Sequence, residues 1–263
     1  MSELPKLTNS WDQAKVDIAN FGIALLADQL SEEQLRLARA ATYAAAEDDV
    51  DLGRKAERFG LDYGVGNIRV WNILNRAPVF REIVQFPVVL ELVQEVIGWP
   101  ALLGNISANI AQPASEGGRW HQDQLFVPKP WPAEPQGLNM GWLLDDFTVH
   151  NGATEVLLGS HLLEEMDADR LTETLASEAV PVVAPAGTLL AMDSRVFHRT
   201  GCNRTKHPRA ALFGWYTRPI YRTQENWFLS LDQSVVDEAT DELLILLGYK
   251  TQGLGLVYGK SPR

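Results

Sequence analysis

The chain has 263 residues, of which 46% are hydrophobic and 22% charged, enough to build one substantial core. We therefore expect a single domain over residues 1–263. Its 23 lysines and arginines stand against 34 acidic residues, a net charge of −11, so no extended basic surface is available for nucleic-acid phosphates. Cys202 is the only cysteine, which excludes an internal disulfide and a thiolate zinc cluster within one chain. Any metal must be held by nitrogen and oxygen.

The start of the chain has no apolar signal core, and no uninterrupted apolar run approaches the roughly 20 residues that span a bilayer. We therefore expect a cytoplasmic protein with no membrane partner and no nucleic-acid partner. The expected partner is a small-molecule substrate, and the expected oligomeric state is a monomer or a homodimer.

The first third of the chain is predicted to be mainly helical. The stretch FGIALLAD, residues 21–28, is a short extended candidate. Ser31 and Gln34 then form a capping box, which predicts the start of a helix over residues 31–50. The alanine and leucine content of this helix indicates that it packs against the core.

Two further segments complete this third of the sequence. Residues 51–71 are punctuated by glycine and lack steady periodicity, which indicates a loop with a short strand at its end. Loops of this length often carry substrate contacts. A second helical region, residues 77–98, is interrupted near Pro87 and stops at Gly98.

From Ala101 onward the pattern changes to short candidate strands separated by turns. Many short strands at modest spacing favour a sandwich or barrel over a parallel sheet with crossover helices. The candidate strands are residues 101–112, 119–127, 137–146, 154–160, 179–185, 187–193 and 209–218. Residues 161–180 allow either a helix or an ordered excursion between strands. A final helix is predicted to end at Gly248.

The stretch WHQDQLF, residues 120–126, places a histidine and an aspartate two positions apart. If this segment is a strand, the side chains of His121 and Asp123 project from the same face. His198, just beyond the candidate strand 187–193, is the third candidate ligand. Two histidines and one carboxylate on one face of an octahedral ion leave three positions open, which suits ferrous iron that binds a co-substrate and dioxygen. Taken alone, however, a His-x-Asp pair is more often an ordinary strand-end pair.

Arg209 follows His198 by eleven residues and begins the candidate strand 209–218. A guanidinium near the metal would bind both oxygens of the far carboxylate of a dicarboxylic keto acid in one plane. Thr154 and Thr200 lie near the same elements and offer hydroxyl donors. The alternatives are a surface ion pair for Arg209 and backbone-bonded turn residues for the two threonines.

The set HQD, then NGATEVLLGSH, then PAGTLLAMDSRVFHRTGCNRTKHPRAAL resembles the phytanoyl-CoA dioxygenase family of iron(II)- and 2-oxoglutarate-dependent oxygenases. The resemblance covers roughly residues 101–217. It implies a mainly β fold with flanking helices: a double-stranded β-helix (a cupin-like jelly roll) over about 101–217, preceded by a helical part over about 1–100. A C-terminal extension over about 218–263 would follow.

The resemblance also implies roles for individual residues. His121, Asp123 and His198 would bind iron(II), and the presence of the aspartate argues against the family's halogenating relatives. Further residues would bind 2-oxoglutarate: Arg209, Thr154, Thr200 and Gln112, the last in the position of a basic residue found in some members. The implied activity is a non-haem dioxygenase that consumes dioxygen and decarboxylates 2-oxoglutarate to succinate and carbon dioxide. Hydroxylation would be the default outcome, with desaturation or ring closure as alternatives.

Aromatic residues favour a moderately apolar small molecule as substrate, of the kind made in secondary-metabolite biosynthesis. The candidate contacts are Trp71, Asn105, Ser107, Asn109, Phe126, Phe213, Trp215, Tyr221 and Trp227. Several of these aromatics have an equally good interpretation as core residues. Coenzyme A esters are disfavoured because their phosphates call for clustered basic residues, and the one small cluster is Arg54, Lys55 and Arg58.

Other classes of function stay open at this point. A metal-dependent hydrolase or isomerase on a similar fold would use the same three ligands but would give Arg209 no keto acid to hold. An acyl-CoA hydroxylase would need a phosphate-binding surface. A non-catalytic binding module would leave the histidines inert.

Overall fold

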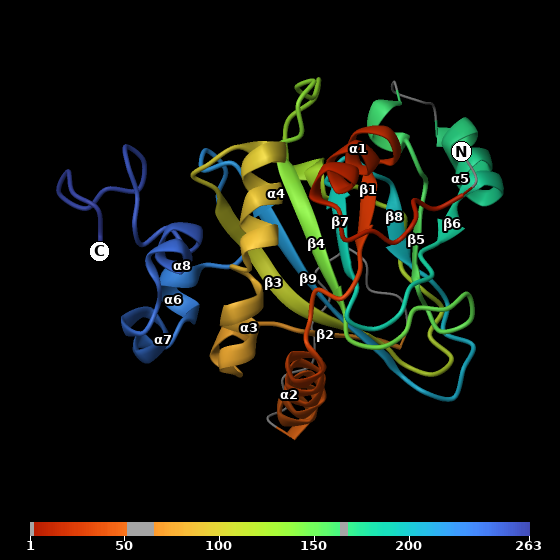
Figure 1. Ribbon diagram of the computed structural model, residues 1–263, viewed down its shortest axis with the longest axis horizontal. Coiled ribbons are helices and arrows are strands. Elements are labelled where there is room, and N and C mark those ends of the chain that lie inside the picture. The colour runs from red at the N-terminus through yellow and green to blue at the C-terminus, as the bar shows by residue number, and fades with distance from the viewer. Residues whose placement is uncertain (1–2, 52–65, 164–167) are drawn as a thin grey trace.

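The computed structural model describes residues 3–51, 66–163 and 168–263. At its centre are two antiparallel sheets (Figure 1), a six-stranded one in the order β1-β7-β4-β9-β3-β2 and a three-stranded one in the order β6-β5-β8. The strands are β1 (Ile23–Leu26), β2 (Asn67–Val70), β3 (Leu102–Ala111), β4 (Gly137–Leu143), β5 (Thr154–Val156), β6 (Val180–Pro181), β7 (Leu189–Asp193), β8 (His198–Thr200) and β9 (Arg209–Thr217). The two antiparallel sheets with flanking helices form the cupin-like arrangement that the sequence predicts.

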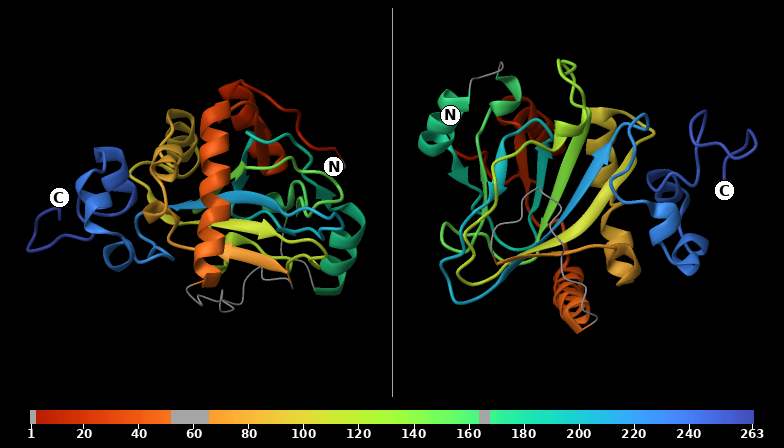
Figure 2. Two further views of the ribbon diagram at one scale, coloured as in Figure 1. Left: turned by 90° about the horizontal axis from the view of Figure 1, so that it is seen from below. Right: turned by 180° about the vertical axis from the view of Figure 1, so that it is seen from behind.

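Most helices lie toward the two ends of the chain, and α5 lies between β5 and β6. They are α1 (Trp11–Phe21), α2 (Glu32–Asp51), α3 (Pro78–Ile83), α4 (Pro87–Ile97), α5 (Ala168–Glu178), α6 (Trp227–Ser230), α7 (Gln233–Asp237) and α8 (Asp241–Leu246), with 3-10 turns η1 (Ile73–Asn75), η2 (Asp123–Phe126) and η3 (Ser160–Leu162). Figure 2 shows α2 crossing the large sheet, with the C-terminal helices at the opposite end of the molecule from the N-terminus. No helix in these described ranges is long and apolar enough to cross a lipid bilayer.

The strands of the large sheet bury both faces. On β9, Leu212 faces a cluster shared with Phe80 of α3 and Leu92 of α4, which cover the outer side of the sheet. The adjacent Ala211 faces the opposite way, into a second cluster with Val156 of the small sheet. This alternation follows from the two-residue period of a strand. Residues at odd positions of β9 therefore face the space between the two sheets.

Several of the predicted elements are confirmed. The capping box before α2 forms, with Gln34 N donating to Ser31 Oγ at 3.2 Å and Ser31 N donating to Gln34 Oε1 at 3.1 Å. The helical region interrupted near Pro87 is the pair α3 and α4, and Pro87 begins the second helix because its fixed φ suits a first helical position. The predicted final helix is α8, which is followed by Gly248 at a φ of 78°.

The prediction of a strand over residues 119–127 is wrong. His121 forms an isolated bridge, and the chain then turns into η2. The backbone N–H of Gln124 donates to Ser194 O at 2.9 Å, which draws the segment off the strand path. The prolines at 128, 130 and 132 also remove backbone donors that a longer strand would need.

Four helices and strands were not predicted, namely α1, β8 and the short helices α6 and α7. The helix α1 has a readable signal, since the Ser10 side chain accepts from Gln13 N and Gly22 ends the helix at a φ of 81°. The strand β8 is three residues long and polar, so it has no periodicity to detect. The basic cluster Arg54, Lys55 and Arg58 lies outside the described residues, and α5 accounts for residues 168–178 of the ambiguous stretch 161–180.

Candidate metal centre

The two histidines are brought together by backbone pairing. His198 begins β8, and His121 forms an antiparallel bridge with it. His121 N donates to His198 O at 3.0 Å, and His198 N donates to His121 O at 2.9 Å. Directly opposed residues in an antiparallel pair direct their side chains to the same face. The two imidazole centroids accordingly lie 4.3 Å apart.

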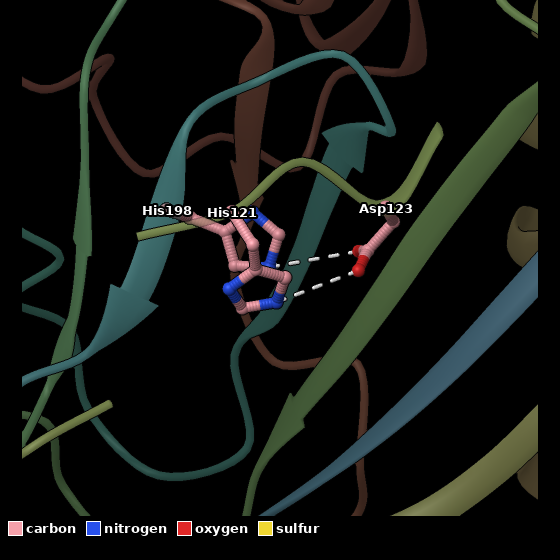
Figure 3. Close-up of side chains that lie close together, drawn as sticks. All are labelled: His121, Asp123 and His198. Atoms are coloured by element: carbon pink, nitrogen blue, oxygen red, sulfur yellow. Dashed lines mark ion pairs between the residues drawn. The ribbon is translucent and has the colours of Figure 1, made fainter. Parts of the chain in front are cut away.

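Asp123 completes the cluster from the first residue of η2 (Figure 3). Its Oδ1 lies 3.6 Å from His121 Nε2, and its Oδ2 lies 3.6 Å from His198 Nε2. One ligand atom from each residue lies within 4.8 Å of the others. The turn therefore does what a strand was expected to do, since it places the carboxylate on the side where the imidazoles meet.

The other ring nitrogen of each histidine contacts a backbone carbonyl. His121 Nδ1 lies 2.9 Å from Arg119 O, and His198 Nδ1 lies 3.0 Å from Val196 O. A carbonyl oxygen can only accept, so each Nδ1 carries the hydrogen, and in the neutral imidazole this leaves the Nε2 lone pair available to a metal. Both lone pairs and the carboxylate thus converge, and this donor set fits a divalent transition metal such as iron(II).

The three residues lie on the wall of one cavity. The other residues that line it are Arg69, Asn105, Phe126, Asn139, Thr154, Arg199, Thr200, Phe213, Trp215 and Gln224. Six of the residues predicted to contact co-substrate or substrate are in this set: Thr154, Thr200, Asn105, Phe126, Phe213 and Trp215.

The predicted hydroxyl donors lie opposite each other. Thr154 on β5 pairs with Thr200 on β8, and both residues are buried. Asn109 on β3 is behind the cavity wall, where its Nδ2 donates to Thr200 Oγ1 at 3.2 Å. This bond crosses from the large sheet to the small one, so it helps to fix the hydroxyl on the inner side.

Arg209 is buried at 1% exposure, which excludes the alternative of a surface ion pair. It shares the inner face of β9 with Ala211 and Phe213, as the two-residue period predicts. Its Nη2 donates to Gly152 O, and its guanidinium carbon lies 4.3 Å from the centroid of the Phe147 ring. The guanidinium therefore lies between the sheets, but it is not among the residues that line the cavity.

The remaining predicted contacts lie away from the cavity wall. Trp227 is 1% exposed and donates from Nε1 to Leu103 O at 2.7 Å, so the structure places it in the core. Tyr221 donates to Gln136 Oε1 at 3.0 Å. Trp71 lies with its ring centroid 5.7 Å from the Arg69 guanidinium carbon. Ser107 is buried opposite Phe213, and Gln112 lies in a turn where its carbonyl accepts from Ser115 N at 3.1 Å.

The cavity wall also contains residues that sequence reasoning did not select. Asn139 interrupts the otherwise apolar strand β4, which is a readable signal of a polar site, whereas Arg69 follows the ordinary polar and apolar alternation of β2. Gln224 lies in an irregular segment after β9 and had no such signal. Arg199 donates from Nε to Glu155 Oε2 at 2.7 Å and stacks over Trp120 at 4.8 Å.

The fold and the centre together define a cupin-like β protein with a cluster of two histidines and one carboxylate. Residues 19–211 match the phytanoyl-CoA dioxygenase (PhyH) family, and the chain belongs to that family. Membership of this family supports an oxidoreductase.

A relative and two solved structures illustrate the similarity. "Dioxygenase af480" of Aspergillus fumigatus is 32% identical over 200 residues, 73% of this chain and 64% of the relative, so the match spans less than two thirds of that protein. A structure described as the non-heme alpha ketoglutarate dependent epimerase SnoN from nogalamycin biosynthesis has a TM-score of 0.64 at 21% identity, covering 83% of this chain and 86% of SnoN. The structure of EctD from S. alaskensis with bound Fe has a TM-score of 0.63 at 21% identity, covering 81% and 79%. Both structures share the fold.

Proposed function

We propose that the protein is a non-haem iron(II)- and 2-oxoglutarate-dependent dioxygenase that oxidises a moderately apolar small molecule. The observation that carries the proposal is the convergence of His121, Asp123 and His198 on one cavity wall, with both Nε2 atoms 3.6 Å from the carboxylate. Membership of a dioxygenase family supports the same reaction class. The cofactors named in the descriptions of SnoN and EctD agree with it.

The three side chains would hold iron(II) and leave its remaining positions toward the cavity. When bound, iron(II) supplies the oxidising chemistry in which dioxygen and 2-oxoglutarate are consumed, succinate and carbon dioxide are released, and one oxygen atom enters the substrate. The protein's own contribution is to fix the ligand orientation and to select the substrate carbon. Hydroxylation is the default outcome, with desaturation or ring closure where the substrate geometry favours them.

A dicarboxylic keto acid would be held on the Arg209 side of the centre. Strand register places Arg69 on β2 level with Asn109 on β3 and Ala211 on β9, so Arg69 lies two strands from β9 and one inner-face position along it from Arg209. Thr154 on β5 pairs with Thr200 on β8, two residues along β8 from His198, and both threonines line the same cavity as Arg69. Two guanidinium groups and two hydroxyls match the charge and the hydrogen-bonding capacity of 2-oxoglutarate. Arg69 thus joins Arg209, Thr154 and Thr200 as a proposed contact of 2-oxoglutarate.

The opposite side of the cavity suits an apolar substrate. Phe126 and Trp215 have ring centroids 6.2 Å apart, and Phe126 is 59% exposed at the mouth of the cavity. Asn105 donates to Gln224 across the same wall, which adds neutral amides able to bond a hydroxyl or carbonyl oxygen. A small secondary metabolite with a ring system and one or more oxygens fits this lining. The nogalamycin pathway named for SnoN is consistent with that substrate class.

The test has two stages. Anaerobic addition of iron(II) and 2-oxoglutarate should give a visible charge-transfer absorption in the wild-type protein and none in His198→Ala. Succinate formation is then measured across a panel of metabolites, with the product mass recorded. Absence of both the absorption and succinate formation in metal-loaded wild-type protein would exclude the proposed function, whereas hydrolysis or isomerisation without keto-acid consumption would favour another metal-dependent enzyme.

A further inference from the structure

Asn139 contacts the proposed metal ligand Asp123 directly. The residue lies on β4 in the middle of the large sheet, between Met192 of β7 and Trp215 of β9. Its side chain faces inward and lines the cavity, with 7% of the residue exposed. Its Nδ2 donates a hydrogen bond to Asp123 Oδ2.

Packing alone does not account for an amide at this position. Burying an amide costs free energy unless it is hydrogen-bonded, and a leucine of similar volume would fill the site without that cost. The Oδ1 of Asn139 is buried without a hydrogen-bond partner in the part of the chain that the structure describes. Burying this oxygen unpaired costs folding free energy, while the Nδ2 of the same amide interacts with the carboxylate of the proposed centre.

The carboxylate needs orientation that its backbone does not supply. Each imidazole is fixed by its Nδ1 contact with a backbone carbonyl. Asp123 lies instead in the four-residue turn η2, and the torsion that rotates a carboxylate is broad and only weakly restricted. The donor from Asn139 restricts this rotation from outside the turn. This hydrogen bond orients the carboxylate in the same way that the backbone carbonyls orient the two imidazoles.

We propose that Asn139 is a positioning residue that orients the Asp123 carboxylate for metal binding. This inference rests on the proposed metal-dependent function. Groups that hydrogen-bond to metal ligands commonly change metal affinity by about 10–100-fold when they are removed. The effect requires no contact between Asn139 and the metal.

The experiment compares cobalt(II) binding to the full-length, metal-free wild type and Asn139→Leu by calorimetry, with the visible cobalt spectrum recorded. We expect the dissociation constant to rise by about 10–100-fold and the cobalt absorption bands to shift, while the melting temperature of the metal-free protein stays close to wild type. Asn105→Leu is the matched control, because it makes the same replacement on the cavity wall without touching Asp123. Its cobalt affinity should equal that of wild type.

Each outcome has a defined meaning. An unchanged affinity and spectrum in Asn139→Leu would overturn the positioning role. If that variant does not fold, Asn139→Ala, which removes the donor without adding bulk, decides the question by the same two measurements. An equal loss of cobalt affinity in Asn105→Leu would also contradict the proposal, since it would show that any such replacement in the cavity lining weakens metal binding. Failure of wild type to bind cobalt or iron would instead refute the metal-dependent function itself.

Discussion

His121 and His198 are joined by two reciprocal backbone hydrogen bonds, of 3.0 and 2.9 Å, so the spacing of their imidazoles is set by strand pairing. Residues 77 positions apart in the sequence are thereby held as direct neighbours. Because the backbone supplies this spacing, the site does not depend on a bound ion to bring the two rings together. The ligands are preorganised, and their fixed Nδ1 contacts leave only the carboxylate to be oriented by a side chain.

His198→Ala should therefore remove metal binding without unfolding the protein. The backbone pairing with His121 does not involve the deleted imidazole, and the lost Nδ1 contact with Val196 O costs on the order of 1 kcal/mol. We expect no detectable iron(II) binding by calorimetry and a circular dichroism spectrum like that of wild type. Asp123→Ala should behave in the same way. Wild-type iron affinity in either folded variant would show that these residues are not the ligands.

The two arginines near the centre should differ in their effects. Arg69→Met should raise the 2-oxoglutarate concentration for half-maximal charge-transfer absorption by at least about tenfold, because a charged hydrogen bond contributes roughly 1.5–3 kcal/mol. Arg209→Met should weaken 2-oxoglutarate binding and also lower the melting temperature, because Arg209 is buried and bonded to Gly152 O. Iron affinity should stay near wild type in both. An unchanged 2-oxoglutarate dependence would remove the affected arginine from the proposed co-substrate site.

The sequence predicted most of the β core because hydrophobic alternation and turn residues are local signals. It also selected His121, Asp123 and His198, although the strand expected to carry the first two is a bridge followed by a 3-10 turn. That turn depends on the hydrogen bond from Gln124 N to Ser194 O, a long-range contact that no local pattern encodes. The same limit applies to Gln224 and to the contact of Asn139 with Asp123. Their roles follow from neighbours on other elements.

Substitutions of Trp227 and Trp215 should have different effects, because Trp227 lies in the core and Trp215 lines the cavity. Trp227 is buried in the hydrophobic cluster that also contains Leu212 and Phe80, and it donates a hydrogen bond to Leu103 O. Trp227→Phe should therefore lower the free energy of unfolding by about 1–3 kcal/mol. Its substrate turnover per folded molecule should stay at the wild-type level. Trp215→Ala should change substrate affinity, since Trp215 lines the cavity beside Phe126. Urea unfolding and steady-state kinetics measure both effects, and a selective change of substrate affinity in Trp227→Phe would reverse this assignment.

His161 should make the stability of the metal-free protein sensitive to acid. Its Nε2 lies 3.1 Å from Ala19 O, and burial lowers the pKa of the side chain below its ordinary value of 6.5. Because His161 binds a proton less readily in the folded state than in the unfolded state, its contribution to stability is fully present above the unfolded pKa. It is lost as the pH falls from about 6.5 toward the lower folded pKa, by at most about 1.4 kcal/mol per pH unit.

The matched variant is His161→Gln, whose side-chain amide can still donate to Ala19 O but does not titrate. Urea unfolding of both proteins between pH 5 and pH 8, free of metal, isolates this one group, because every other ionisable residue is common to the pair. The free energy of unfolding of wild type should decline relative to that of the variant as the pH decreases below about 6.5. A constant difference between the two proteins across this range would mean that His161 has the same proton affinity in the folded and unfolded states.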